Sequence, residues 1–349
     1  MTVTEKSFGQ TKNGKEVKIF TITNNKGNEA VVSEFGAVLV SLKIKNDKGE
    51  SKDVVLGYES VKNYEANPAF FGGVIGPNAN RIANGKFKID GVEYNLPTND
   101  GKNNLHSDFD IGYHKQLWKG EIVDNGVKLT YEKPDMLMGV PGNIKTSVTY
   151  TFNDDNELKI EYNAVSDKKT IVNLTNHSYF SLGGDGAGSD SVFDTLLTIN
   201  ASKFTEIDDG GIPTGKLIDV AGTPLDFTKP KKIGKEINAD FKQMVMVKGY
   251  DHNYALDNYT GEVRKVAEAT CDGRTMEVYT DLPGMQFYTG NWIDDNAGKG
   301  GKKGNLYKER GAFCLETQFF PNSCNDATFV SPVKGANEKY HSVTMYKFK

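Results

Sequence analysis

Two histidines and one glutamate lie in segments whose composition suits proton-transfer chemistry. His106 ends the segment NNLH (103–106), His177 lies within TNHSYF (175–180), and Glu316 lies within CLETQFFPN (314–322). Imidazole and carboxylate are the side chains that exchange protons near neutral pH. The Asn, Gln, Tyr and Arg residues of these and similar segments offer hydrogen bonds that suit a polyhydroxylated ligand. The sequence therefore predicts acid–base chemistry on such a molecule.

Side chains alternate between the two faces of a strand, so the faces of the predicted strands can be compared. If residues 171–180 form one strand, one of its faces is polar without being charged. That face holds Asn173, Thr175, His177 and Tyr179, and the opposite face holds Val172, Leu174 and Phe180. A polar, uncharged face is unusual for a solvated surface and typical of a ligand groove.

Three further predicted strands carry acid or amide groups on one side. In residues 312–320, one face holds Cys314, Glu316 and Gln318, and the other holds Phe313, Leu315 and Phe319. In residues 249–256, one face holds Asp251 and Asn253, and the other holds His252, Tyr254 and Leu256. In residues 285–289, Gln286 and Tyr288 share a face. Alternation alone leaves open whether these faces meet in one groove.

The same residues also have structural interpretations. The histidines expected to be structural are His114, His252 and His341. Glu316 could form a buried ion pair with Arg81 or with a lysine, and Asn80 and Arg81 could brace a loop. Trp292 is expected to pack rather than to contact a ligand. No two histidines have the close spacing of a zinc site, and the Gly-rich segment 183–186 lacks the phosphate-loop pattern.

Strands and turns dominate the elements that must position these groups. Residues 86–96 alternate around Asp90-Gly91, a pair that suits a type I′ hairpin turn, and residues 147–162 form a second hairpin around 153–156. Residues 17–22 and 30–44 are predicted strands, and helical periodicity is limited to 61–66 and 234–247. This pattern predicts an all-β fold, a large antiparallel sandwich with few short helices. No linker interrupts the 349 residues, so we expect a single domain, residues 1–349.

The composition narrows the classes of function. Lys and Arg number 42 against 46 Asp and Glu, and a net charge of −4 argues against an electrostatic nucleic-acid binder. The N-terminal segment lacks the apolar region of a secretory signal, and no apolar run approaches the roughly 20 residues that cross a bilayer. Three widely spaced cysteines favour reduced thiols. We therefore expect a cytoplasmic protein that binds neither nucleic acid nor membranes.

Six short segments, taken in order, resemble the aldose 1-epimerase family, also called galactose mutarotases. They are NRI (80–82), NNLH (103–106), TNHSYF (175–180), GYDHNY (249–254), LPGMQFYTGN (282–291) and LETQ (315–318). Each segment alone is modestly specific, whereas six in the family's order are highly specific and cover nearly the whole chain. The resemblance implies the galactose mutarotase-like super-sandwich, a large antiparallel β-sandwich.

The resemblance also implies a reaction and residue roles. The family interconverts the α and β anomers of free hexoses such as galactose and glucose by opening and closing the sugar ring, with no metal and no organic cofactor. Glu316 matches the general base that takes the anomeric proton, and His177 matches the general acid that protonates the ring oxygen. The positions that hold sugar hydroxyls or assist protonation match Asn80, Arg81, His106, Asp251 and Gln286. The expected partner is a free aldohexose, and the protein is expected to be a monomer or a homodimer.

One departure from the family pattern bears on the shape of a loop and on sugar preference: Ser107-Asp108 stands where many members have Gly-Gly. Three other functions compete with anomerisation. A glycoside hydrolase would use two carboxylates about 5–10 Å apart, here Glu316 and Asp251, and would not need the imidazole acid. A sugar-binding module would lack one member of the acid–base pair. An epimerase of hexose 6-phosphates would need a basic cluster at the far end of the site.

Overall fold

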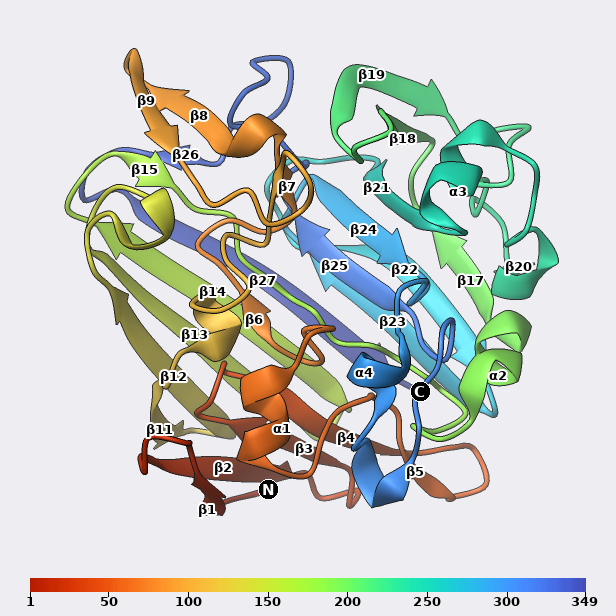
Figure 1. The fold of residues 1–349 in the computed structure, drawn as a ribbon. Coiled ribbons are helices and arrows are strands. Elements are labelled where there is room, and N and C mark those ends of the chain that lie inside the picture. Colours follow the sequence, from red (N-terminus) through yellow and green to blue (C-terminus); the bar gives the residue numbers. More distant parts are fainter.

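Three antiparallel sheets make up most of the regular structure (Figure 1). The computed structural model describes residues 1–349. The N-terminal sheet has five strands in chain order: β1 (Thr2–Gln10), β2 (Glu16–Thr23), β3 (Glu29–Ser33), β4 (Leu39–Lys45) and β5 (Ser51–Asp53). The expected fold class, an antiparallel all-β architecture with few short helices, is confirmed.

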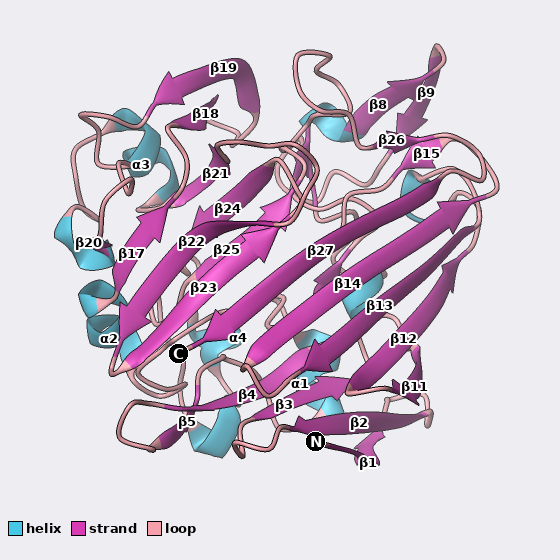
Figure 2. Cartoon of the chain, turned by 180° about the vertical axis from the view of Figure 1, so that it is seen from behind, coloured by secondary structure: helices cyan, strands magenta, loops and turns pink.

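The largest sheet has nine strands and forms the back of the molecule (Figure 2). In spatial order they are β11 (Lys119–Val123), β12 (Gly126–Lys133), β13 (Ile144–Phe152), β14 (Glu157–Ser166), β27 (Lys339–Phe348), β23 (Arg274–Thr280), β22 (Arg264–Cys271), β17 (Leu196–Ile199) and β20 (Lys231–Lys232). Strand β27 lies between β14 and β23, so a late segment of the chain joins the two halves of this sheet.

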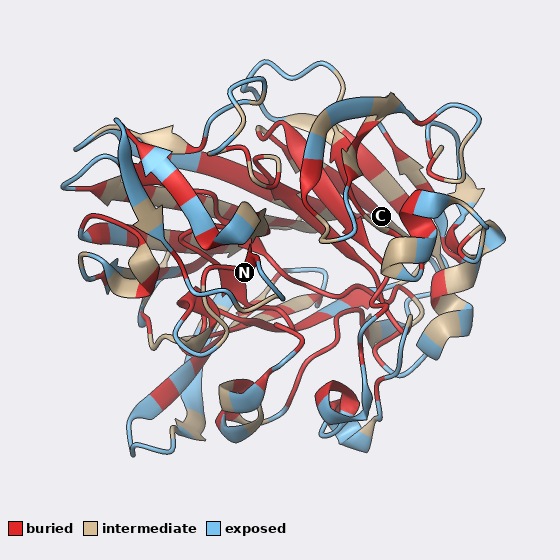
Figure 3. Cartoon of the chain, turned by 45° about the horizontal axis from the view of Figure 1, so that its top comes forward, coloured by how far each residue is buried: buried red, intermediate tan, exposed pale blue.

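A second five-stranded sheet lies in front of the large one (Figure 1). Its order is β19 (Pro213–Asp219), β18 (Lys203–Ile207), β21 (Asp251–Ala255), β24 (Gly284–Tyr288) and β25 (Cys314–Gln318). The Tyr346 hydroxyl of β27 donates to the Leu315 carbonyl of β25 at 3.1 Å, and the hydroxyls of Thr317 and Thr344 are 2.5 Å apart. These contacts fix β25 directly over the centre of the large sheet, and buried residues run along the strands of both layers (Figure 3).

Short ladders and helices complete the chain. The ladders pair β6 (Val74–Ile75) with β16 (Thr175–Asn176), β7 (Arg81–Ile82) with β10 (Asn104–Leu105), β8 (Lys86–Ile89) with β9 (Val92–Asn95), and β15 (Thr170–Ile171) with β26 (Val333–Lys334). The helices are α1 (Val61–Ala66), α2 (Gly188–Asp194), α3 (Lys242–Val247) and α4 (Asp295–Gly298). Single 3-10 turns cover Ala83–Gly85, Tyr113–Lys115, Leu137–Gly139, Ile233–Lys235 and Lys302–Gly304. None of the helices has the length and apolar character needed to cross a bilayer.

Several local predictions are confirmed. The two hairpins are β8–β9 and β13–β14. Asp90 and Gly91 both take a positive φ, 51° and 82°, as a type I′ turn requires. The short helix predicted at 61–66 is α1, and the side chain of its N-cap, Ser60, accepts the Asn63 backbone N–H.

Two predicted elements are wrong in extent. Residues 30–44 form β3 and β4, separated where Gly36 and Ala37 turn the chain with positive φ. Residues 171–180 do not form one strand, because their backbone groups change partner: β15 pairs with β26, β16 pairs with β6, and Phe180 N–H donates to Phe313 O. The one short helix predicted within 234–247 is α3, and Asn238 and Asp240 precede it in a stretch of turns that favours polar, helix-competing residues.

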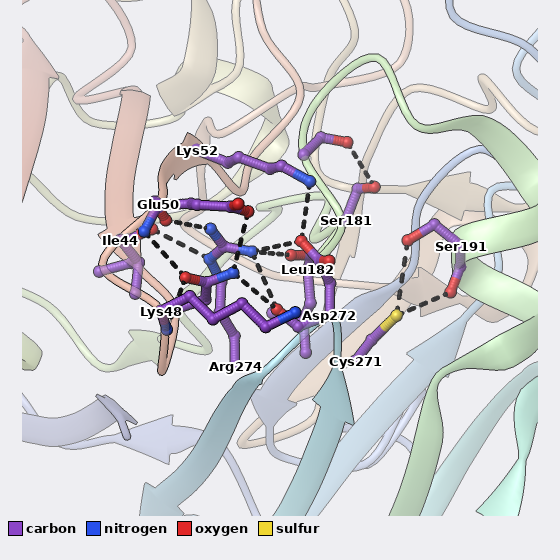
Figure 4. A network of polar contacts seen from close by, with 12 residues as sticks. Ile44, Lys48, Glu50, Lys52, Ser181, Leu182, Ser191, Cys271, Asp272 and Arg274 are labelled. Carbon is purple, nitrogen blue, oxygen red and sulfur yellow. Dashed lines mark hydrogen bonds and ion pairs between the residues drawn. The ribbon is translucent and has the colours of Figure 1, made fainter.

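Arg274 connects the large sheet with the N-terminal sheet (Figure 4). Its side chain is fully buried, and its guanidinium donates to the backbone carbonyls of Ile44 (3.0 Å), Leu182 (3.2 Å) and Glu50 (2.5 Å). The guanidinium also pairs with the Asp272 carboxylate at 2.6 Å. One charge therefore satisfies acceptors from three separate segments.

Replacing Arg274 with Met is expected to lower the free energy of unfolding by about 3 kcal/mol, because buried carbonyls and a carboxylate lose their donor. Urea denaturation followed by circular dichroism measures this loss. Lys52→Met is the matched control, because Lys52 pairs with the same Asp272 but is 40% exposed, and such pairs are worth about 0–1 kcal/mol. Equal effects of the two substitutions would contradict the role assigned to Arg274.

Candidate active site

One cavity of about 600 Å³ opens between the second five-stranded sheet and loops that come before and between its strands in the chain. All seven residues predicted from the sequence line it: Asn80, Arg81, His106, His177, Asp251, Gln286 and Glu316. They come from six separate segments, so the fold rather than proximity in sequence brings them together.

The register of the second five-stranded sheet gathers the carboxylates and amides on one face. Gln286 of β24 lies directly opposite Glu316 of β25 and Asn253 of β21. Paired residues of antiparallel strands share a face, and Asp251 lies two residues from Asn253 on the same side. The polar faces predicted separately for these three strands therefore form one continuous face, which is the floor of the cavity.

Glu316 is held by apolar neighbours in the chain. Leu315 and Phe319 belong to the main hydrophobic core, which fixes β25 with the Glu316 side chain turned toward the cavity. Glu316 is only 2% exposed, and its Oε2 atom has no hydrogen-bond partner. Arg81, the ion-pair partner considered for Glu316, instead pairs with Asp100, with Nε and Oδ2 2.8 Å apart. The burial of the Glu316 carboxylate is therefore not explained by a structural ion pair with Arg81.

His177 directly follows β16, in a segment without regular secondary structure. Its backbone N–H donates to Gly73 O at 2.9 Å, and its carbonyl accepts from Gly72 N–H at 3.0 Å. The imidazole is stacked between Phe70 and Tyr179, with ring centroids 5.7 Å and 5.0 Å away. Its Nε2 atom lies 3.7 Å from Oε1 of Glu316.

Burial shifts the pKa values of this pair in opposite directions. Desolvation raises the pKa of Glu316 well above 4.5, with a further contribution from the negative charge of Asp251. Desolvation lowers the pKa of His177 to about 4. His177 is therefore neutral at neutral pH, and a proton on Glu316 is retained to higher pH than on an exposed glutamate. Such opposed shifts are typical of groups that exchange protons with a ligand.

His106 presents one ring nitrogen to the cavity as a donor. Its Nδ1 atom accepts the Asn80 backbone N–H at 3.1 Å, so in the neutral ring the proton is on Nε2. Burial lowers the pKa of His106 well below 6.5, which keeps the ring neutral. His106, His177 and Glu316 each have one atom able to bind a metal ion, and these three atoms lie within 4.8 Å of one another. A metal bound at His106 Nε2 would require the ring proton to move to Nδ1, where it would oppose the Asn80 N–H, so this set does not fit a metal ion.

A chain of amides fixes the floor of the cavity. The Gln286 amide donates to Asp251 Oδ1 at 2.7 Å, and the Gln318 amide donates to Gln286 Oε1 at 3.3 Å. Gln318 Oε1 in turn accepts from the Asn80 amide at 3.5 Å. Gln318 is fully buried and bonds to two of the predicted site residues, Gln286 and Asn80, although the sequence singled it out only for its shared face with Glu316.

Known proteins resemble this chain in sequence over nearly its full length. The family model of aldose 1-epimerase matches residues 18–347. The chain belongs to the aldose 1-epimerase family. Rat galactose mutarotase is 38% identical over 351 residues, covering 100% of this chain and 99% of that protein. The aldose 1-epimerase of Escherichia coli K12 is 36% identical over 343 residues, covering 96% of each chain.

A solved structure agrees with the fold. The galactose 1-epimerase of Lactobacillus acidophilus superposes with a TM-score of 0.85 at 27% identity, covering 100% of this chain and 98% of that one. This aldose 1-epimerase family member is accordingly an enzyme of the isomerase class.

Ser107 and Asp108 give the loop after His106 a defined shape in this family member. Ser107 has a positive φ of 65°, a conformation that glycine adopts more easily. Its hydroxyl offsets this strain, since it accepts Asn78 N–H and donates to Asn78 O, both at 2.9 Å. The Asp108 carboxylate accepts the backbone N–H groups of Asp110 and Ile111. Neither side chain lines the cavity.

The remaining histidines lie outside the cavity, as expected. His114 is buried with its ring edge against Phe70, and His252 is buried against Phe204. His341 is half exposed beside Glu161 and Asp281.

The sequence interpretation missed part of the cavity wall. Trp292, expected to pack, is 53% exposed and lines the entrance, where the Lys248 ammonium lies 4.3 Å from its ring. Phe70 has a positive φ of 61°, and its ring packs against the rings of both His106 and His177. No local pattern marks Phe70.

A turn at 208–211 also closes over the cavity and was not predicted as part of the site. Gly211 has a φ of +72°, and a Cβ there would approach Arg81 Nε to 2.9 Å. The DDGG sequence at 208–211 is a turn signal that could have been noticed.

Replacing Glu316 with Gln is expected to stabilise the protein selectively at high pH. A carboxyl group whose folded pKa is raised contributes stability below its unfolded pKa, and this contribution is lost as the pH rises through the folded pKa. Glutamine does not titrate, so the Tm of the variant minus that of the wild type should grow by about 1–4 °C between about pH 4 and pH 8. Scanning calorimetry at both pH values measures this difference, and an unchanged difference would contradict the raised pKa.

Proposed function

We propose that this protein interconverts the α and β anomers of free aldohexoses such as galactose and glucose, in galactose metabolism. The observation that carries the proposal is the 3.7 Å approach of His177 Nε2 and Glu316 Oε1 in a cavity with hydrogen-bonding groups on its floor. Membership of a family whose relatives are named galactose mutarotase and aldose 1-epimerase supports it.

In the proposed reaction, the ionised Glu316 takes the proton of the anomeric hydroxyl. The bond between C1 and the ring oxygen breaks, and His177 gives its Nε2 proton to that oxygen. The open aldehyde rotates about C1–C2 and the ring closes on its other face. Both protons then return, so the cycle has no net change of charge or oxidation state. Two positioned acid–base groups typically contribute about 10²–10⁴-fold each to such a rate.

The other lining residues suit the binding of sugar hydroxyls. His106 Nε2–H and the Arg81 guanidinium are donors, the Asp251 carboxylate is an acceptor, and the Gln286 and Asn80 amides are linked to them. Arg81 is held by Asp100 and by the turn at Gly211, so its donors are preorganised. The proposed chemistry uses only side chains of this kind and needs no cofactor.

The charge of the cavity disfavours a phosphorylated sugar. Its charged lining residues are Arg81 and Lys102 against Asp100, Asp209, Asp251 and Glu316. This excess of carboxylates would repel a phosphate dianion, and Arg81 is already paired. A hydrolase would require two carboxylates acting on opposite sides of a glycosidic bond. Here the group closest to Glu316 across the cavity is an imidazole, which favours anomerisation over hydrolysis.

The test is polarimetry of freshly dissolved α-galactose and α-glucose with and without the protein. We expect the approach to equilibrium rotation to accelerate in proportion to protein concentration. Parallel assays use nitrophenyl galactoside and glucose 6-phosphate. Release of nitrophenol, or acceleration with the phosphate ester alone, would replace the proposal with one of the competing functions, and no acceleration of either free sugar would refute it.

The rate should depend on pH through Glu316. Burial raises the pKa of Glu316 well above 4.5, so the base becomes available only as the pH rises through that raised value. His177, with a pKa of about 4, stays neutral over the same range. We expect kcat/KM to show one acid limb whose midpoint lies above 4.5, measured by polarimetry after subtraction of the spontaneous rate. A midpoint at or below that value would contradict the assignment.

We further propose that the 349 residues form one catalytic domain, acting in the cytoplasm as a monomer or homodimer. A hydrophobic core shared by all three large sheets supports the single domain. The three cysteines are free thiols, in keeping with a reducing compartment. Light scattering after size-exclusion chromatography determines the oligomeric state.

A further inference from the structure

The Nδ1 atom of His177 has one side-chain partner, the thiol of Cys314. The Sγ–Nδ1 distance is 3.6 Å, and both residues are buried. Cys314 lies on β25 two residues before Glu316 and on the same face, so one strand contacts both ends of the imidazole: Cys314 at Nδ1 and Glu316 near Nε2. Reactive histidines usually have a carboxylate or a carbonyl at the nitrogen away from the ligand. A thiol in that position requires an explanation.

The direction of this hydrogen bond depends on which nitrogen of the His177 ring carries the proton. Burial raises the pKa of Cys314 well above 9.0, and the charges of Glu316 and Asp251 act in the same direction. The group is therefore a neutral thiol, which can donate S–H to Nδ1 or accept weakly from Nδ1–H, and Nδ1 of His177 is its one hydrogen-bond partner. If S–H donates to Nδ1, that nitrogen carries no proton, and the single proton of the neutral ring is on Nε2.

The aromatic walls prevent the ring from exchanging its two nitrogens. Phe70 and Tyr179 lie on its two faces at interplanar angles of 25° and 24°, and the Tyr288 ring is nearly perpendicular to it, with the ring centroids 6.2 Å apart. A ring flip would require these packed groups to separate. The orientation set by Cys314 is therefore retained.

We propose that Cys314 is a positioning residue that holds the ring proton of His177 on Nε2, the nitrogen that faces Glu316 and the cavity. Its catalytic consequence rests on the proposed function. The neutral imidazole then presents N–H to the sugar ring oxygen, and the S–H bond to Nδ1 stabilises the negative charge that develops on the ring as Nε2 gives up its proton. The competing arrangement places the proton on Nδ1, directed at the residue's own backbone, and leaves the buried S–H without an acceptor.

The proton position can be measured without any sugar. In the ¹⁵N NMR spectrum of a neutral histidine, the protonated and unprotonated ring nitrogens have well-separated resonances. We expect His177 of the wild-type protein to be protonated on Nε2 at neutral pH. Cys314→Ser keeps a donor and should keep this tautomer, whereas Cys314→Val removes the donor and should shift the population toward Nδ1–H. A wild-type ring protonated on Nδ1 would overturn the proposal, even if no variant folds.

Activity provides the second readout. With α-galactose, Cys314→Val should lower kcat about 10-fold with KM changed less than about twofold, because orientation rather than sugar contact is lost. Cys314→Ser should recover most of kcat. Cys271→Ser is the control, because Cys271 contacts Ser191 and lies outside the cavity. An unchanged tautomer and unchanged kcat in Cys314→Val would also overturn the proposal. If neither the wild-type protein nor any variant acts on a sugar, the proposed function is refuted, but the NMR measurement still tests the position of the ring proton.

Discussion

Glu316→Gln is expected to lower kcat for anomerisation of galactose by about 10²–10⁴-fold, the range of a positioned general base. Glutamine has nearly the shape of glutamate but cannot accept the anomeric proton. KM should change little, because Arg81, His106, Asp251 and Gln286 remain in place to bind the sugar. Polarimetry gives kcat, and stopped-flow rates with enzyme in large excess give the chemical step directly.

Sugar binding by this variant can be followed separately through tryptophan fluorescence. The chain has two tryptophans, of which Trp118 is buried in the core and Trp292 is half exposed at the cavity entrance. A change in Trp292 emission on adding galactose reports binding without turnover. Glu121→Gln is the matched control, because Glu121 is exposed on β11 and far from the cavity lining. If Glu316→Gln kept the kcat of the wild type, Glu316 would not be the general base.

His177→Gln is expected to lower kcat by a similar factor of about 10²–10⁴. The amide can reach toward the ring oxygen but cannot deliver a proton to it. His341→Gln is the matched control, since His341 is half exposed and distant in the fold from the cavity. The double variant Glu316→Gln/His177→Gln should be little slower than either single variant, because the two groups act as one unit. Multiplicative losses would indicate two independent contributions instead.

Strand alternation correctly predicted which side chains form the floor of the cavity, but it was wrong that residues 171–180 form one strand. In β21, β24 and β25 the ladder is continuous, so period-two alternation placed Asp251, Gln286 and Glu316 on their correct faces. The register that aligns these faces depends on pairing between distant segments, which alternation within one segment does not contain. Residues 171–180 broke the rule because their backbone bonds to loops. His177 and Tyr179 still reach the cavity, whereas the Asn173 side chain bonds to Phe319 and does not line it.

The cavity walls were less predictable than its floor. Trp292 and the turn at 208–211 come from loops whose course is set by tertiary contacts such as Gly211 against Arg81. Phe70 is placed by a left-handed backbone conformation, which a phenylalanine in the sequence does not predict. The six family segments supplied the identities of the polar residues, but neither these segments nor composition gave the aromatic packing that orients His177.

The position of β27 in the middle of the nine-stranded sheet has a consequence for biosynthesis. Its neighbour β14 is complete at Ser166, yet residues 167–338 must be translated before β27 exists to pair with it. During that interval the nascent chain exposes an open edge of β14, and after residue 280 has been made it also exposes an edge of β23; unpaired edges invite intermolecular pairing. Until β27 is made, the growing chain can therefore pair with other chains along these edges.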